Sequence, residues 1–319
     1  MTRSLVPEPD FAPAEAGAAS RRTVLKAGAA AALGLGAVRI GGVSAQTATP
    51  SASPAACVLT PELTEGPYYV AGELVRQAIT EGKAGVPLTL RIAVSALAAC
   101  GPLANAAVDI WHCDAQGYYS GITGENPGGG GSSTSAENAH TTFLRGIQLT
   151  GADGTAEFQT IFPGWYAGRT VHIHMKVHVD GASAAASSDA SAAATPTGGE
   201  TYQGGHVAHT GQLFFADDLQ KAVFATAAYA RSSDNGHIYN ESDNILGDHA
   251  GEPGFLVDIA YVDQSSIEKG LIGAITVGVD PTATPAATSG GGPSGGGPGG
   301  PPPSGGPGGP PNGTPPSGA

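Results

Sequence analysis

The segment 170–179 constrains the fold most strongly, because it has the pattern of a single β-strand with one polar face. Apolar and polar residues alternate along its sequence, TVHIHMKVHV. Side chains two positions apart on a strand lie on the same face, so His172 and His174 point the same way and are placed to hold one metal ion. His178 shares this face but lies about 13 Å from His174 at the usual rise per residue. We therefore interpret His178 as a structural or surface residue.

Other parts of the chain also have the pattern of short strands separated by turns. The predicted strands are 86–94, 107–111, 145–150, 156–161, 211–215 and 272–277. The Gly-Ala-Asp-Gly turn at 151–154 predicts a hairpin between two of them. Alanine content and apolar spacing predict one helix at 219–230. Together these features predict an all-β fold, a β-sandwich core with long loops and one short helix.

The composition indicates a globular core with biased, disordered ends. The chain of 319 residues contains 50 Gly and 25 Pro, and only 13% of its residues are charged. We expect the core domain at 57–279, preceded by a flexible Thr/Ser/Ala/Pro linker at 46–56. An Ala/Ser-rich stretch at 181–199 predicts a disordered insertion between two strands. The Gly/Pro-rich tail, 280–319, has too little apolar surface to fold.

The N-terminus has the features of an export signal. Residues 20–26 read Ser-Arg-Arg-Thr-Val-Leu-Lys, which is typical of a twin-arginine signal. A small apolar stretch at 27–38 follows, and Val-Ser-Ala at 43–45 suits a signal peptidase. The apolar stretch is too short to span a membrane. We therefore expect a signal peptide at 1–45, no membrane span after its cleavage, and an extracellular, periplasmic or cell-wall location. The alternative is a basic N-terminus followed by an ordinary helix.

The net charge narrows the classes of binding partner, and the cysteine content predicts the disulfide chemistry. A formal net charge of −13 argues against nucleic acid or an anionic membrane as partner. In an oxidising compartment, Cys57, Cys100 and Cys113 predict one disulfide and one free thiol. We favour a pairing of Cys57 with Cys100, although the sequence alone does not determine it. None of the three has the spacing of a zinc ribbon.

Two tyrosine-bearing turns accompany the paired histidines. Tyr166 ends a Pro-Gly-Trp-Tyr turn just before the histidine strand, and the turn 117–120, Gly-Tyr-Tyr-Ser, follows the strand 107–111. Phenolate oxygen is a hard, anionic donor that suits a highly charged cation, whereas imidazole suits iron, zinc, copper and nickel alike. The combination favours ferric iron and oxygen chemistry on an aromatic substrate. The histidine pair by itself is equally consistent with a polar strand face or with zinc or copper.

Several motifs occur in an order that is specific as a set. They are TEGPYY (64–69), VDIWH (108–112), GYYS (117–120), FLRG (143–146), FPGWY (162–166), RTVHIH (169–174) and TGQLFF (210–215). In these motifs the chain resembles the intradiol ring-cleavage dioxygenases, the family of protocatechuate 3,4-dioxygenase and catechol 1,2-dioxygenase. The resemblance covers most of the chain between about residues 57 and 220.

The resemblance implies a non-haem Fe(III) held by two tyrosines and two histidines, namely Tyr119, Tyr166, His172 and His174. The Gly-x-Tyr-Ser pattern of the family selects Tyr119 over Tyr118, which would otherwise be a core or pocket-wall aromatic residue. In the family, the tyrosine at the position of Tyr166 leaves the iron when substrate binds.

The resemblance also implies a substrate pocket and a reaction. Arg169 would face the substrate, Gln212 would lie in the pocket, and Gly66, Pro67 and Tyr68 would form its wall. Arg169, Gln212 and Tyr166 would then serve catalysis. The structural alternatives are a surface ion pair for Arg169, a strand-edge polar residue for Gln212 and a tight turn for residues 66–68.

The implied reaction is intradiol cleavage of a catechol-type ring with O2 to a cis,cis-muconate-type diacid, of the EC 1.13.11 type. A zinc or copper enzyme and an exported, non-catalytic binding module are the alternatives. The chain also departs from the family in two places. The helical segment through which catechol 1,2-dioxygenases dimerise has no counterpart, and the spacing from Tyr166 to His172 is short. Oligomeric state and substrate choice therefore do not carry over.

Overall fold

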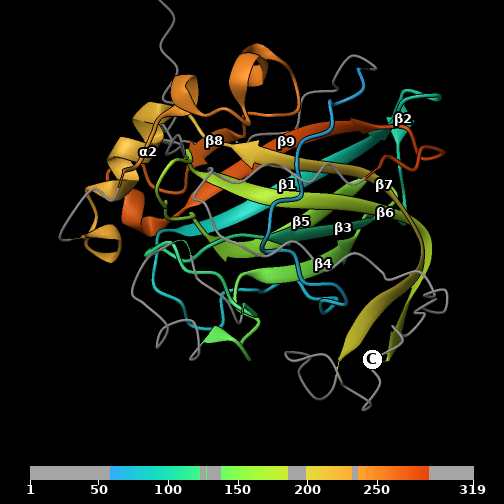
Figure 1. The fold of residues 1–319 in the computed structure, drawn as a ribbon, viewed down its shortest axis with the longest axis horizontal. Helices are drawn as coiled ribbons and strands as arrows, with labels where there is room; N and C mark the ends of the chain where they lie inside the picture. Colours follow the sequence, from blue (N-terminus) through green and yellow to red (C-terminus); the bar gives the residue numbers. More distant parts are fainter. Residues whose placement is uncertain (1–57, 123–126, 128–137, 186–198, 232–235, 287–319) are drawn as a thin grey trace, which may run out of the picture. The chain divides into compact units, whose positions relative to one another are not determined.

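Two β-sheets pack face to face in a computed structural model that describes residues 58–122, 127, 138–185, 199–231 and 236–286 (Figure 1). The strands are β1 (Pro87–Ala96), β2 (Gly101–Pro102), β3 (Ala107–Trp111), β4 (Arg145–Leu149), β5 (Thr155–Ile161), β6 (His172–Ala185), β7 (Glu200–Phe214), β8 (Asp258–Tyr261) and β9 (Leu271–Val279). The helices are α2 (Asp217–Phe224) and the 3₁₀ turns η1 (Ala227–Tyr229), η2 (Asn240–Ser242), η3 (Gly247–Gly251) and η4 (Ile267–Lys269). The predicted all-β sandwich is confirmed.

The chain divides its strands between a four-stranded and a five-stranded sheet. The four-stranded sheet has the order β4-β3-β6-β7, with every neighbouring pair antiparallel. The five-stranded sheet has the order β2-β1-β9-β8, and β5 also pairs with β1. Strands β1 and β9 are parallel. The histidine strand β6 is therefore a central strand, paired on both of its edges.

The hydrophobic core lies between the two sheets and contains side chains from both. Alternate residues of β1 are buried, as the sequence pattern predicts. The same core cluster contains Leu90, Phe158, Ile275, Ile110, Ile173 and Leu213. In β6, the odd-numbered apolar positions are core members, so the even-numbered histidines lie on the opposite face of the sheet.

The outer face of the four-stranded sheet is covered by the segment that precedes β1. Leu63 N donates to Thr210 O of β7 at 3.0 Å. The ring of Tyr69 packs on Trp111 of β3, with ring centroids 4.8 Å apart. Further along, Val75 bridges to Ile147 of β4. All five residues of β3 are consequently buried, including those that point away from the core.

The predicted hairpin between the strands at 145–150 and 156–161 is wrong. The turn itself forms, with Gly151 N donating to Thr155 O at 3.0 Å. However, β4 pairs with β3 of one sheet, whereas β5 pairs with β1 of the other. The turn therefore connects the two sheets. The prediction failed because local alternation of apolar and polar residues indicates a strand but not the strand with which it pairs.

Two predicted boundaries also differ from the structure. The insertion predicted at 181–199 begins later, because residues 181–185 continue β6 and pair with residues 200–204 of β7. The helix predicted at 219–230 is the shorter α2 followed by η1. The chain leaves α-helical geometry at Thr226, whose backbone N and hydroxyl both donate to Val223 O, at 2.9 and 2.8 Å.

Several predictions concern residues outside the described ranges. The undescribed residues include the predicted signal peptide 1–45, the linker 46–56, most of the insertion and most of the tail. Cys57 also lies outside, while Cys100 is disulfide-bonded and Cys113 is a buried free thiol. The disulfide-bonded state of Cys100 and the free thiol of Cys113 agree with the favoured pairing of Cys57 with Cys100. Within the described ranges, none of the helices has the length and apolar character that a membrane crossing requires.

A neutral histidine joins the end of β3 to the other sheet. His112 Nδ1 donates to Cys113 O at 2.8 Å, so its Nε2 accepts the Thr160 hydroxyl of β5, also at 2.8 Å. Complete burial lowers the pKa of His112 to about 4. The hydrogen bond to Thr160 therefore requires the unprotonated ring.

This histidine predicts a pH-dependent contribution to stability. Between pH 6.5 and pH 4 the unfolded chain binds a proton at His112 that the folded chain does not, so stability falls as the pH falls. A His112→Gln variant lacks this titration. We expect the stability advantage of the wild type over the variant to shrink by about 1 kcal/mol per pH unit across that window. Urea unfolding at several pH values measures it, and a constant advantage would contradict the neutral assignment.

Candidate metal centre

The two histidines of β6 lie side by side on the outer face of the four-stranded sheet. Their Nε2 atoms are 3.2 Å apart, and both side chains are buried. Because Nδ1 of His172 donates to Thr170 O at 2.7 Å, its Nε2 carries a lone pair. The second imidazole is held by Trp111 of β3, which stacks on His174 with an interplanar angle of 4°. The predicted same-face arrangement of the pair is confirmed.

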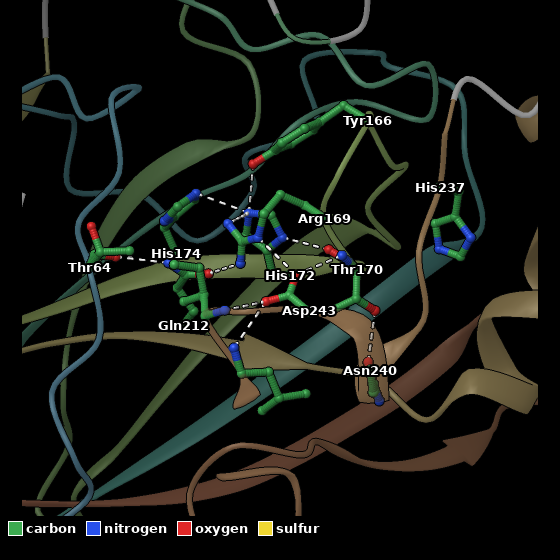
Figure 2. Close-up of polar contacts among 12 residues, drawn as sticks. Thr64, Tyr166, Arg169, Thr170, His172, His174, Gln212, His237, Asn240 and Asp243 are labelled. Atoms are coloured by element: carbon green, nitrogen blue, oxygen red, sulfur yellow. Dashed lines mark hydrogen bonds and ion pairs between the residues drawn. The ribbon is translucent and has the colours of Figure 1, made fainter. Parts of the chain in front are cut away.

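Tyr166 approaches the pair from the loop that leads into β6. Its hydroxyl donates to His172 Nε2 at 2.9 Å, and the ring is buried (Figure 2). Gly164 in this loop packs closely beneath the turn after β3, where an added Cβ would lie 2.4 Å from Asp114 O. The loop that carries Tyr166 is thus seated on the turn that carries the other tyrosine.

Tyr119 is the tyrosine of the 117–120 turn that faces the cluster. Its ring centroid lies 6.0 Å from that of Tyr166 and 6.1 Å from that of His174, and the residue is fully buried. The carboxylate of Asp114 holds the turn, since Asp114 Oδ1 accepts the backbone N–H of Tyr118 at 3.0 Å. Tyr118 itself is only half-buried.

Burial determines the protonation of the four side chains. It lowers the pKa values of His172 and His174 well below the usual value, so both rings are neutral. Burial, and then the neighbouring phenol, raises the pKa of Tyr119, and burial also raises that of Tyr166. Both phenols therefore keep their protons unless a strong positive charge joins them.

The donor set fits a metal ion of high charge. Two imidazole Nε2 atoms face each other, two phenol oxygens belong to the same cluster, and buried Nδ1 of His174 has no hydrogen-bond partner in the described part of the chain. A hard cation would convert the phenols to phenolates and balance their charge. Among the described residues, no group of three or more His, Cys, Asp or Glu forms a competing metal site.

Arg169 and Gln212 lie beside the histidines and bind each other. Arg169 Nη2 donates to Gln212 Oε1 at 2.6 Å, and Arg169 Nη1 is 3.5 Å from His172 Nε2. Gln212 is the cross-strand neighbour of His174 and donates to Thr64 O at 2.8 Å. The structure therefore brings both sequence-predicted pocket residues to the cluster.

The predicted pocket wall also meets the cluster. Tyr68 stacks on Tyr119 with ring centroids 4.6 Å apart and lies edge-on to Tyr166. Gly66 has φ +75°, and a Cβ built there would lie 2.9 Å from His174 Cε1. Pro67, between them, is exposed. Glycine is thus required at position 66 both for its backbone angle and for the close approach of His174.

One residue near the centre carries no local signal in the sequence. Asp243 accepts Arg169 Nε at 2.8 Å, although 74 residues separate them. Thr64 belongs to the 64–69 motif, and its carbonyl accepts the amide of Gln212, which is 148 residues away. His178 does not join the cluster: it lies farther along β6 and faces Asp109 at 3.7 Å, in agreement with its interpretation as structural. Only long-range pairing identifies Asp243.

Known proteins are similar to this chain in sequence and in fold. A family model described as Dioxygenase matches residues 64–186. Catechol 1,2-dioxygenase 1 of Acinetobacter lwoffii is 32% identical over 148 residues, which cover 39% of this chain and 43% of that protein. A solved intradiol ring-cleavage dioxygenase from Tetranychus urticae is 27% identical with a TM-score of 0.53, covering 72% of this chain and 98% of that one. The chain thus spans less than half the length of the curated relative.

The fold and the site together define a β-sandwich protein with a buried histidine–tyrosine cluster on one sheet face. The family model, which matches residues 64–186, and the intradiol relatives support the intradiol ring-cleavage dioxygenase family for this chain. Proteins of this family generally use a non-haem Fe(III). The matched region, 64–186, contains Tyr119, Tyr166, Arg169 and both histidines, whereas Gln212 and Asp243 lie beyond it.

Gly66→Ala should weaken the binding of a metal ion at the cluster, with Fe(III) as the test ion, because the added methyl group displaces the ring of His174. Gly72→Ala is the matched control, since Gly72 has a similar φ of +83° with no atom within 4 Å of the added Cβ. Both variants should lose about 1 kcal/mol of stability from backbone strain. Only the first should also lose iron when loaded protein is challenged with a chelator. Equal iron retention would contradict the close approach of Gly66 to His174.

Proposed function

We propose that this protein cleaves a catechol-type aromatic ring between its two hydroxyl-bearing carbons, using O2 and a bound Fe(III), to give a cis,cis-muconate-type diacid. The observation that supports this most directly is the meeting of two phenols with two imidazoles on one buried sheet face. The histidines alone would suit zinc or copper, whereas the paired phenols favour ferric iron.

Tyr119, Tyr166, His172 and His174 would hold the metal. Bound Fe(III) would act as a Lewis acid that draws electron density from the catechol and makes its ring reactive towards O2. Two of the four groups are held firmly by their surroundings. The His172 ring is oriented by its hydrogen bond to Thr170 O, and the His174 ring by the stacked indole of Trp111.

Tyr166 and Arg169 have complementary tasks towards the substrate. A catechol that binds as a dianion must lose two protons. We assign the phenolate oxygen that Tyr166 would carry in the metal-loaded site as the acceptor of one, and hydroxide from the solvent as the acceptor of the other. The Arg169 guanidinium is a cation, and its Nη1 lies 3.5 Å from His172 Nε2. It would stabilise negative charge that develops on the substrate oxygens.

Gln212 and the 66–68 wall shape the surroundings of these groups. The amide of Gln212 is fixed at both ends, by Arg169 and by Thr64 O. The Tyr68 ring lies against both tyrosines of the cluster. These contacts favour a flat aromatic ligand, and they keep the polar groups in one arrangement before the substrate binds.

Tyr119 and its neighbour Tyr118 provide a matched test. Tyr119→Phe removes a phenol of the cluster, so the iron-loaded variant should lose most of its visible tyrosinate-to-iron absorption and lower kcat by more than about 100-fold. Tyr118→Phe should retain the colour, the iron and the activity. Visible spectra, iron analysis and O2 uptake with a panel of catechols measure these effects.

The outcomes of this test separate the competing functions. A colourless protein that is active with zinc or copper would replace the iron proposal with another metalloenzyme. A protein that takes up no O2 with any catechol, and tolerates loss of Tyr119, Tyr166 and both histidines without functional loss, would be a binding module. If Tyr118→Phe rather than Tyr119→Phe removed the colour, the choice of tyrosine would be wrong.

We also propose that the protein is exported by the twin-arginine route. The paired arginines at positions 21 and 22, followed by an apolar stretch, support this proposal. Arg21→Lys combined with Arg22→Lys should retain the protein in the cytoplasm, as measured by immunoblotting of cell fractions. Unchanged export of the double variant would overturn the twin-arginine route.

A further inference from the structure

The carboxylate of Asp243 is the charged partner of Arg169 and is fully buried. Its Oδ2 atom accepts Arg169 Nε and the backbone N–H of Thr170, each at 2.8 Å. Its Oδ1 atom accepts the backbone N–H groups of Ile245 and Leu246, each at 2.9 Å. Four donors thus hold this carboxylate in place, two of them from its own turn.

The loop that carries Asp243 is anchored to the fold independently of Arg169. Leu246 is fully buried in a small apolar cluster with Phe214, the last residue of β7. Asn240, three residues before Asp243, accepts the Thr170 hydroxyl at 2.7 Å (Figure 2). The position of the carboxylate therefore follows from the packing of its loop against the four-stranded sheet.

This anchored carboxylate determines how the Arg169 guanidinium is turned. A guanidinium is planar, and its N–H groups form a rigid fork. Arg169 Nε is held by Asp243 and Nη2 by Gln212, so Nη1 is the nitrogen directed at the cluster, 3.5 Å from His172 Nε2. Two fixed points in a planar group leave it no freedom to rotate.

The same carboxylate oxygen also reaches the histidine strand. Oδ2 of Asp243 binds the Thr170 N–H, and the carbonyl of Thr170 accepts His172 Nδ1. One atom thus anchors both the cation and the residue that orients the His172 imidazole. No other acidic side chain in the described ranges forms an ion pair with Arg169.

We propose that Asp243 is a positioning residue for the reaction: it does not touch the substrate, but aims the Arg169 guanidinium at the site. This inference rests on the proposed function and concerns a residue outside the region that the family model matches. A preorganised cation stabilises developing charge without having to reorient during the reaction. Without its carboxylate partner, the guanidinium would rotate away from the cluster.

A double-mutant cycle tests whether Asp243 acts through Arg169. Asp243→Asn replaces an acceptor oxygen with an NH2 group that cannot accept the N–H donors. We expect it to lower kcat/KM by about 10- to 100-fold. In an Arg169→Met background the same change should cost several-fold less, because the guanidinium that it positions is absent and only its contacts with backbone N–H groups remain. Equal losses in both backgrounds would overturn the proposal.

Two further variants keep the cycle interpretable. Asp243→Glu retains the charge and serves if Asp243→Asn fails to fold; the longer side chain should displace the guanidinium and show the same dependence on Arg169. Glu157→Gln removes a carboxylate that pairs with Arg91 in the other sheet, and should leave kcat/KM unchanged in both backgrounds. An equal loss for Asp243→Glu with and without Arg169 would also refute the positioning role.

A measurement without turnover separates this inference from the proposed function. In the metal-free, full-length protein, the Arg169 Nε–H bonded to a buried carboxylate should give a slowly exchanging NMR signal, identified by its loss in Arg169→Met. Asp243→Asn should abolish its protection from exchange. A signal that stays protected in this variant would overturn the positioning role even if the enzyme is active. A protected signal that depends on Asp243, in a protein that cleaves no catechol, would instead refute the proposed function alone.

Discussion

The two-residue period of β6 is the constraint on which the rest of this structure depends. A strand in the middle of a sandwich must give one face to the core, and the apolar residues at odd positions do so. The even positions are thereby turned to the outer face, where His172 and His174 meet at 3.2 Å. Neither histidine can move to the core face, because β3 and β7 pair with β6 on both sides and fix its register.

Covering that outer face converts a row of polar side chains into a site. The segment that includes Thr64, Gly66 and Tyr68 lies over the histidines and removes them from water. Burial keeps the imidazoles neutral and the phenols protonated, which makes the cluster a receptor for positive charge. The nearby cation does not compete for this role, because Asp243 balances the charge of Arg169.

Local patterns predicted most of the strands, because alternation and turn residues act over a few positions. These patterns failed where the result depends on which strands pair with each other. The strands on either side of the 151–154 turn join different sheets, and residues 181–185 extend β6 only because residues 200–204 lie opposite them. The site residues in the motifs at 64–69, 117–120 and 162–174 were predictable from their resemblance to a family. Asp243 was not, because no motif surrounds it and its partner is 74 residues away.

The sequence by itself determined the chemistry that is available: two histidines one residue apart on a strand, two tyrosine-bearing turns, and an arginine just upstream. Side-chain period and donor type are local properties, so they can be inferred from the sequence alone. Only the tertiary structure decided which groups meet. It placed the ring of Tyr119, rather than that of Tyr118, against Tyr166 and His174, and it brought Asp243 to Arg169. These contacts arise from packing between segments far apart in the chain, which no local pattern encodes.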